Sequence, residues 1–135
     1  MCYSFSMLIT SLDSIKGTEA EVKPEEGTWV SHRLLLKKDG MGFSFHDTTV
    51  FAGASLEVWF KNHLEAVYCI SGEGEVQTTA DGKVYPIKPG TLYALDKHDK
   101  HTLRANTDLR LICVFTPALT GREVHDKDGS YPLLD

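Results

Sequence analysis

Turn signals divide this chain into many short segments, and their spacing is the feature that most limits its fold. Glycine, proline, asparagine and aspartate gather at intervals of roughly 8 to 12 residues, which is typical of β-sandwiches and β-barrels. These signals fall at Asp39-Gly40, Gly53, residues 71–74, Asp81-Gly82, Pro89-Gly90, residues 96–99, residues 106–108 and Pro117. The sequence therefore predicts an all-β domain built from short strands.

Two segments between these turns indicate which side chains the strands bury. The segment Leu109–Phe115 is apolar at nearly every position, so we expect this strand to be largely buried. In Glu65–Ile70, Glu65 shares a face with Val67 and Cys69, because side chains alternate along a strand. An acidic side chain is thus predicted among apolar neighbours.

Helical patterns are scarce in this sequence. Only Ile9–Gly17 has one, with Ser11 or Asp13 as its N-cap and Gly17 as its stop, so at most one or two short helices are expected. The acidic stretch Glu19–Glu26 is interpreted as a solvated loop.

The length of 135 residues corresponds to one domain. We expect residues 7–135 to form it, with residues 1–6 as a disordered N-terminal extension. Residues 119–135 are a candidate mobile lid over a binding site.

Composition narrows the choice of partners. The net charge of -5 and the scattered lysines argue against nucleic acid, which requires a basic surface. No apolar run of membrane-spanning length and no signal peptide is visible, so a cytoplasmic protein with no membrane partner is expected. Three cysteines without CxxC spacing indicate neither a disulfide framework nor a structural zinc site. A small-molecule ligand is the remaining expectation.

The stretches 62–76 and 82–101 carry glycine and proline punctuation that resembles a cupin barrel, a jelly-roll or double-stranded β-helix. Cupins commonly hold a metal with a His-x-His pair, a glutamate and a third histidine. Here the glutamate is kept as Glu65, but the pair reads Val58 and Phe60, and Tyr93 follows the Pro89-Gly90 turn. The resemblance implies a cupin fold in which the usual metal-binding histidines are replaced by other residues.

Three other residues are candidates for a relocated metal site. Tyr93 and His101 flank the polar run 96–99, which reads as a hairpin turn centred on Lys97. Facing residues of such a hairpin would lie about 5 Å apart at Cβ, and Glu65 would complete a carboxylate, phenolate and imidazole set. These donors suit iron or another first-row divalent ion. The alternative is that all three are ordinary core or surface residues.

Four longer runs resemble ectoine synthase, and together they reach from about Met7 to the end of the chain. They are RLLLKKDGMGFSFHDTTVFAG (33–53), NHLEAVYCISGEGEV (62–76), YPIKPGTLYALDKHDKH (85–101) and LTGREVHDKDGSYPLL (119–134). The resemblance implies an iron-dependent hydro-lyase, a homodimer, that forms ectoine from N-γ-acetyl-L-2,4-diaminobutyrate with release of water.

The same resemblance implies roles for individual residues. It places Glu65, Tyr93 and His101 as ligands of Fe²⁺, or of another first-row divalent metal, and Glu123, Tyr93 and His125 in catalysis. It places the substrate against Trp29, Arg33, Thr48, Cys113, Phe115 and Glu123. Glu123 is the first choice for the general base, with His125 as the alternative. Phe60 departs from the family, which usually has a tyrosine there.

Two other functions compete with this interpretation. One is a non-catalytic cupin module that binds a small solute, and the other is a cupin dioxygenase or isomerase, since fold does not fix function. The missing His-x-His pair argues against an ordinary cupin oxygenase. A binding module would not need a complete set of metal ligands together with Arg33 and Glu123.

Overall fold

The computed structural model describes residues 7–127 and 129–133, so the expected disorder of residues 1–6 lies outside the described residues. The secondary-structure elements of the described part are α1 (Leu12–Ile15), β1 (Glu21–Val22), β2 (Trp29–Leu35), the 3₁₀ helix η1 (Lys37–Asp39), β3 (Ser44–Val50), β4 (Ser55–Val58), β5 (Leu64–Ser71), β6 (Gly74–Thr78), β7 (Val84–Ile87), β8 (Leu92–Leu95), β9 (His101–Ala105) and β10 (Leu109–Thr116). The predicted all-β architecture is confirmed.

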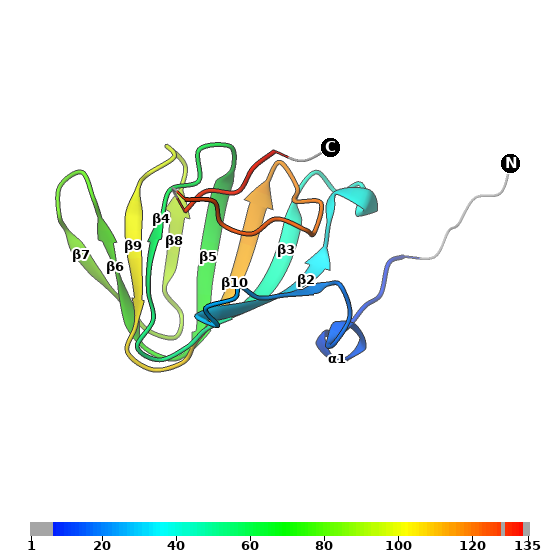
Figure 1. The fold of residues 1–135 in the computed structure, drawn as a ribbon, viewed down its shortest axis with the longest axis horizontal. Helices are drawn as coiled ribbons and strands as arrows, with labels where there is room; N and C mark the ends of the chain where they lie inside the picture. The colour runs from blue at the N-terminus through cyan, green and yellow to red at the C-terminus, as the bar shows by residue number, and fades with distance from the viewer. Residues whose placement is uncertain (1–6, 128, 134–135) are drawn as a thin grey trace, which may run out of the picture.

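The strands form two antiparallel sheets that curve toward each other (Figure 1). The six-stranded sheet has the order β1-β2-β3-β10-β5-β8, and the four-stranded sheet has the order β4-β9-β6-β7. Neighbours in a sheet are often distant in sequence, since β10 lies between β3 and β5. This interleaving gives a jelly-roll barrel of the cupin kind.

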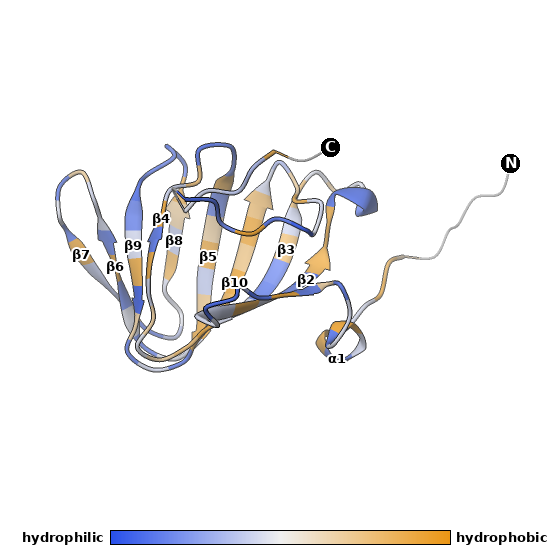
Figure 2. Ribbon diagram, viewed as in Figure 1, coloured by the Kyte–Doolittle hydropathy of each residue, from blue (hydrophilic) through white to orange (hydrophobic). Residues whose placement is uncertain are grey.

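The core lies between the two sheets. On β10 the side chains of Leu109, Leu111, Cys113 and Phe115 point inward and are almost fully buried, as their alternation predicts. The opposite face of β10 is only half-buried, so the expectation of a largely buried strand holds for one face. Figure 2 shows β10 as one of the most apolar strands, in contrast to the hydrophilic segment around η1.

Two local predictions need correction. The helix α1 covers only Leu12–Ile15, within the expected Ile9–Gly17, and Ser11 is the N-cap because its hydroxyl accepts from the Ser14 N–H. The stretch expected to be a loop contains β1, whose Glu21 pairs with His32 of β2 in the ladder. The Glu21 carboxylate also lies 2.8 Å from His32 Nε2, which fixes the strand to its neighbour.

The hairpin predicted between Tyr93 and His101 is wrong. β8, which carries Tyr93, pairs with β5 in the six-stranded sheet. β9, which carries His101, pairs with β4 and β6 in the four-stranded sheet. The polar run between them therefore crosses from one sheet to the other. Both side chains nevertheless point into the barrel, because each keeps the inward parity of its own strand.

Gly129 allows the C-terminal segment to approach the barrel closely. Its backbone has φ +73°, and a Cβ at this position would lie 2.1 Å from the Glu57 carbonyl oxygen. Both the positive φ and the short distance exclude any residue other than glycine at this position. The close approach permits the Trp59 N–H to donate to the Gly129 carbonyl oxygen over 3.1 Å.

None of the described helices has the length and apolar character needed to cross a membrane.

Candidate active site

A cavity between the two sheets gathers most of the residues singled out from the sequence. It encloses about 480 Å³ of empty space, part of it open to solvent. Eight of the predicted site residues line it, namely Trp29, Thr48, Glu65, Tyr93, His101, Cys113, Phe115 and His125. A largely apolar cavity with a few converging polar groups is the usual form of a small-molecule site.

The three candidate metal ligands reach this cavity from both sheets. Tyr93 on β8 is paired with Val67 of β5, so Glu65 lies two residues along the same inward face. His101 comes from β9 in the opposite sheet, and its ring centroid lies 6.2 Å from that of Tyr93. The structure thus brings the triad together across the barrel interior and not across a hairpin.

Burial shifts the pKa values of these three candidate ligands so that their neutral forms are favoured. Desolvation raises the pKa of Glu65 to about 8, although a hydrogen bond with Cys113 acts in the other direction. The pKa of Tyr93 is raised well above its ordinary value by burial and then by the nearby Glu65. The pKa of His101 is lowered by burial. A cation placed among these groups would compensate the cost of ionising the carboxyl and the phenol.

The hydrogen bond of His101 fixes its tautomer. Nδ1 lies 3.0 Å from the Asp99 carbonyl oxygen, which can only accept, so Nδ1 carries the proton. Nε2 is then unprotonated and available as a metal ligand, in the arrangement common for histidine ligands. Within the described range, no three histidine, cysteine, aspartate or glutamate side chains gather as a metal site. A site here therefore needs the Tyr93 phenol, and the donor set fits a first-row divalent ion.

The buried carboxyl of Glu65 makes the stability of the metal-free protein depend on pH. Its folded pKa of about 8 lies above that of the unfolded chain, so the folded protein keeps a proton that the unfolded chain loses first. The contribution of this group to the free energy of unfolding is therefore present at acidic pH. It falls as pH rises from roughly 5 to about 8, by up to about 1.4 kcal/mol per pH unit.

Glu65→Gln should remove this dependence. We expect the free energy of unfolding of the metal-free variant, minus that of the metal-free wild type, to increase with pH across the same window. Taking the difference is necessary because buried His63, His101 and His125 have lowered pKa values and give an opposite slope at acidic pH. Denaturant titrations at several pH values measure it, and a difference independent of pH would contradict the proposed protonation.

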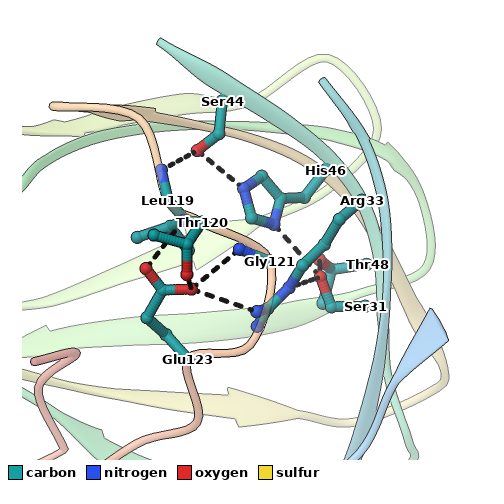
Figure 3. A network of polar contacts seen from close by, with 9 residues as sticks. All are labelled: Ser31, Arg33, Ser44, His46, Thr48, Leu119, Thr120, Gly121 and Glu123. Atoms are coloured by element: carbon teal, nitrogen blue, oxygen red, sulfur yellow. Dashed lines mark hydrogen bonds and ion pairs between the residues drawn. The ribbon is translucent and has the colours of Figure 1, made fainter. Parts of the chain in front are cut away.

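Arg33 and Glu123 are not among the residues that line the cavity. Figure 3 shows Arg33 between Glu123 and Ser31, and Ser31 does line the cavity. Arg33 is 1% exposed, and neither of its terminal nitrogens Nη1 and Nη2 has a hydrogen-bond partner among the described residues. Nη1 lies 3.9 Å from a Glu123 oxygen, and the guanidinium carbon lies 5.6 Å from the Tyr131 ring centroid. A buried guanidinium with unsatisfied N–H donors can bind an anionic group by donating hydrogen bonds to it.

The carboxylate of Glu123 already accepts hydrogen bonds from its own loop. Burial opposes its charged form, but hydrogen bonds from the Thr120 N–H, the Thr120 hydroxyl and the Gly121 N–H outweigh it and lower the pKa of Glu123. This carboxylate is therefore ionised, held by its own loop and aimed toward Arg33. It is better placed to orient the guanidinium than to reach the cavity.

The C-terminal segment closes one end of the barrel, where Figure 1 shows it running across the sheets beyond β10. It is fixed by donation from the Lys61 N–H to the Ser130 hydroxyl over 3.1 Å and from the Asn62 side chain to the Tyr131 carbonyl over 2.9 Å. The Tyr131 ring stacks on Phe60 and on His125, with centroids 4.9 and 4.6 Å apart. The candidate lid thus packs over the cavity, although residues 128 and 134–135 lie outside the described part.

Sequence reasoning missed three polar residues that line the cavity, Ser31, His46 and Tyr131. The first two stand on β2 and β3 at inward positions, and strand parity could have indicated them. Tyr131 follows no periodic pattern. The presence of an aromatic residue inside the polar C-terminal run was the only signal for it.

Comparison with known proteins gives a consistent result. The family model described as ectoine synthase matches residues 7–135. The L-ectoine synthase of Desulfatibacillum aliphaticivorans is 64% identical over 129 residues, which cover 96% of this chain and 99% of that protein. The L-ectoine synthase of Halalkalibacterium halodurans is 60% identical, with coverage of 96% and 98%.

Solved structures agree with the sequence matches. The crystal structure of ectoine synthase from P. lautus superposes with a TM-score of 0.85 at 54% identity and covers 95% of this chain and 91% of that one. Ethanolamine utilization protein Q from Salmonella typhimurium superposes with a TM-score of 0.61 at 20% identity, with coverage of 70% and 73%. At that identity the likeness concerns the fold alone.

Proposed function

This chain belongs to the ectoine synthase family, and from that premise we propose how its cavity performs the reaction of an L-ectoine synthase. The substrate is N-γ-acetyl-L-2,4-diaminobutyrate, whose α-amino nitrogen attacks the acetamide carbonyl carbon and closes a six-membered ring. A C–N bond forms, and both hydrogens of the neutral amine leave with the carbonyl oxygen as water. A C=N bond remains in the product, ectoine.

The observation that carries this proposal is the placement of the donor set. Glu65, Tyr93 and His101 face one largely apolar cavity, and a buried guanidinium with unsatisfied donors lies beside Ser31, which lines that cavity. An acetamide and a carboxylate, the two ends of the substrate, match these two features. We propose iron(II) as the resident metal, with other first-row divalent ions as substitutes. When bound, it would polarise the acetamide oxygen as a Lewis acid.

We propose that Arg33 binds the substrate carboxylate. Its two terminal nitrogens have the fork geometry that a carboxylate accepts, and among the described residues neither has a hydrogen-bond partner at close range. Burial lowers the pKa of Arg33, although the Tyr131 side chain favours its charged form and acts to raise that pKa. Glu123 holds the guanidinium from the other side at 3.9 Å. The Thr48 hydroxyl lines the cavity close to this end of the substrate, where it donates to Ser31 over 3.3 Å and so helps to hold the residue that accepts from Arg33 Nε.

His125 is better placed than Glu123 to act as the base. It lines the cavity, and burial lowers its pKa to about 4, so the ring is neutral at physiological pH. A neutral imidazole can take a proton from the amine during attack, and its low pKa favours returning that proton to the departing hydroxyl. Glu123 then serves as the positioning partner of Arg33.

The apolar walls of the cavity would exclude water and hold the chain of the substrate. Trp29 and Phe115 are both buried and line the cavity, and the Cys113 thiol lies beside Glu65. Tyr131 closes the end covered by the C-terminal segment. Holding the amine and the carbonyl together in a dry site favours ring closure over hydrolysis.

A direct assay tests the function. Iron-loaded protein is incubated with N-γ-acetyl-L-2,4-diaminobutyrate, and ectoine is followed by chromatography. We expect stoichiometric conversion with one water released per turnover. Absence of product, with iron in the protein and substrate binding both verified, would support the non-catalytic solute-binding module instead.

We also propose a cytoplasmic homodimer. The outer face of β5 and β8 exposes Leu64, Tyr68, Ile70 and Leu92, and the strand β8 ends its sheet in the described part. A second copy placed against this edge would cover the apolar side chains and the unpaired backbone groups.

A further inference from the structure

A buried chain of hydrogen bonds runs from Arg33 to the first residues of the C-terminal segment, and His46 stands at its centre (Figure 3). The His46 ring is 1% exposed. Its Nδ1 lies 3.2 Å from the Ser31 hydroxyl, and its Nε2 lies 2.8 Å from the Ser44 hydroxyl.

The donors and acceptors around Ser31 determine the direction of the chain. The Ser31 oxygen accepts from Arg33 Nε over 3.4 Å and from the Thr48 hydroxyl over 3.3 Å. A hydroxyl oxygen has two acceptor positions and one hydrogen to give, so the Ser31 hydrogen must go to His46 Nδ1. Nδ1 is therefore an acceptor, and the proton of the neutral ring is on Nε2.

The other end of the chain reaches the segment that covers the cavity. His46 Nε2–H donates to the Ser44 oxygen, which also accepts from the Leu119 N–H over 3.1 Å. Leu119 is fully buried and precedes the part of the chain that carries Glu123, His125 and Tyr131. One imidazole thus connects the anchoring of Arg33 with the start of the covering segment.

Protonation of the ring would break this arrangement. A charged imidazole donates from both nitrogens, so the Ser31 oxygen would have to accept from His46 and could keep only one of its two present donors, Arg33 and Thr48. Burial, followed by the charges of Arg33 and His63, lowers the pKa of His46 well below its ordinary value. Burial and nearby charges therefore favour the same neutral form of His46 that its hydrogen bonds require.

We propose that His46, as the neutral ring protonated on Nε2, is a positioning residue that links the orientation of Arg33 to the docking of the C-terminal segment through Ser31 and Ser44. This inference rests on the proposed role of Arg33 in binding the substrate carboxylate. As a consequence, the orientation of Arg33 at one end of the active site and the position of the C-terminal segment at the other end depend on each other.

A double-mutant cycle tests the link. Ser31→Ala and Ser44→Ala remove groups that share no hydrogen bond with one another, so without a relay their effects on kcat/KM should multiply within about twofold. We expect kcat/KM of the double variant to differ by about fivefold or more from the value obtained by multiplying the two single effects, because residues of one network influence each other. In a His46→Phe background, which keeps the ring shape, the deviation should disappear. Multiplicative effects in the histidine background, or a deviation that persists with phenylalanine, would overturn the link.

The tautomer is measured without turnover. The full chain is labelled with ¹⁵N-histidine and loaded with zinc, which keeps NMR signals near the site sharp. The Nε2 signal of His46 is assigned by its change in chemical shift when Ser44 is replaced by alanine. We expect a protonated Nε2 and an unprotonated Nδ1 at neutral pH. A proton on Nδ1, or on both nitrogens, would refute the proposal even if the Phe variant did not fold. Because this measurement uses no substrate, its failure is distinct from a failure of the proposed reaction.

Discussion

His101→Ala is expected to give a folded protein that retains almost no iron and forms ectoine on the order of a thousandfold more slowly. The side chain is the one ligand of the proposed set that comes from the four-stranded sheet, and Glu65 and Tyr93 alone leave an incomplete set. Loss of the Lewis acid removes several kcal/mol of transition-state stabilisation, which corresponds to a factor of this size. Iron content per chain and the initial rate measure the two effects.

Two companion variants make this result specific. His98→Ala removes an exposed histidine from the crossover between β8 and β9, so iron content should stay near that of the wild type. Tyr93→Phe keeps the ring and removes only the phenol oxygen, and it should lower iron content as His101→Ala does. Full iron occupancy in both His101→Ala and Tyr93→Phe would disprove the proposed ligand set.

Arg33→Met should raise KM strongly, and kcat/KM should fall by roughly 30-fold to several thousandfold. Truncating one member of a buried charged contact costs about 2 to 5 kcal/mol, and here both the substrate carboxylate and Glu123 lose their cation. Arg33→Lys keeps the charge but not the fork, so an intermediate loss is expected. Steady-state kinetics with varied substrate separate KM from kcat.

Arg110→Met is the matched control for Arg33. Arg110 also carries a guanidinium close to a carboxylate, with Nη2 2.6 Å from Asp47, but its side chain is 45% exposed on the outer face of the sheet. Arg110 does not line the cavity, so kinetic constants close to wild type are expected, although the buried Asp47 carboxylate loses its partner and the free energy of unfolding should fall. If Arg33→Met left KM unchanged, the carboxylate would have to bind elsewhere in the cavity.

The sequence could predict which way side chains point better than which strands meet. Alternation placed Glu65, Val67 and Cys69 on one face of a strand, and the structure shows that this is the buried face of β5. The polar run after Tyr93 looked like a hairpin turn because a local pattern carries no information on sheet membership. In a jelly roll such a run can equally cross between sheets, and here it does.

The polar groups around the cavity were harder to foresee. Arg33 and Glu123 were named through the family resemblance, but their contact with each other depends on a loop that returns to β2 from ninety residues further along the chain. Strand parity could have indicated that Ser31 and His46 point inward, but their importance lies in the directions of their hydrogen bonds. Such directions become visible only when the backbone is in place.

The division of the proposed ligands between two sheets has a thermodynamic consequence. Glu65 and Tyr93 belong to the six-stranded sheet and His101 to the four-stranded one, so an ion held by all three would act as a cross-link through the barrel. Its binding free energy would then also oppose separation of the sheets. At a free metal concentration of a hundred times Kd this amounts to about 2.7 kcal/mol of added stability. Metal supply would thus govern how long the enzyme survives as well as how fast it works.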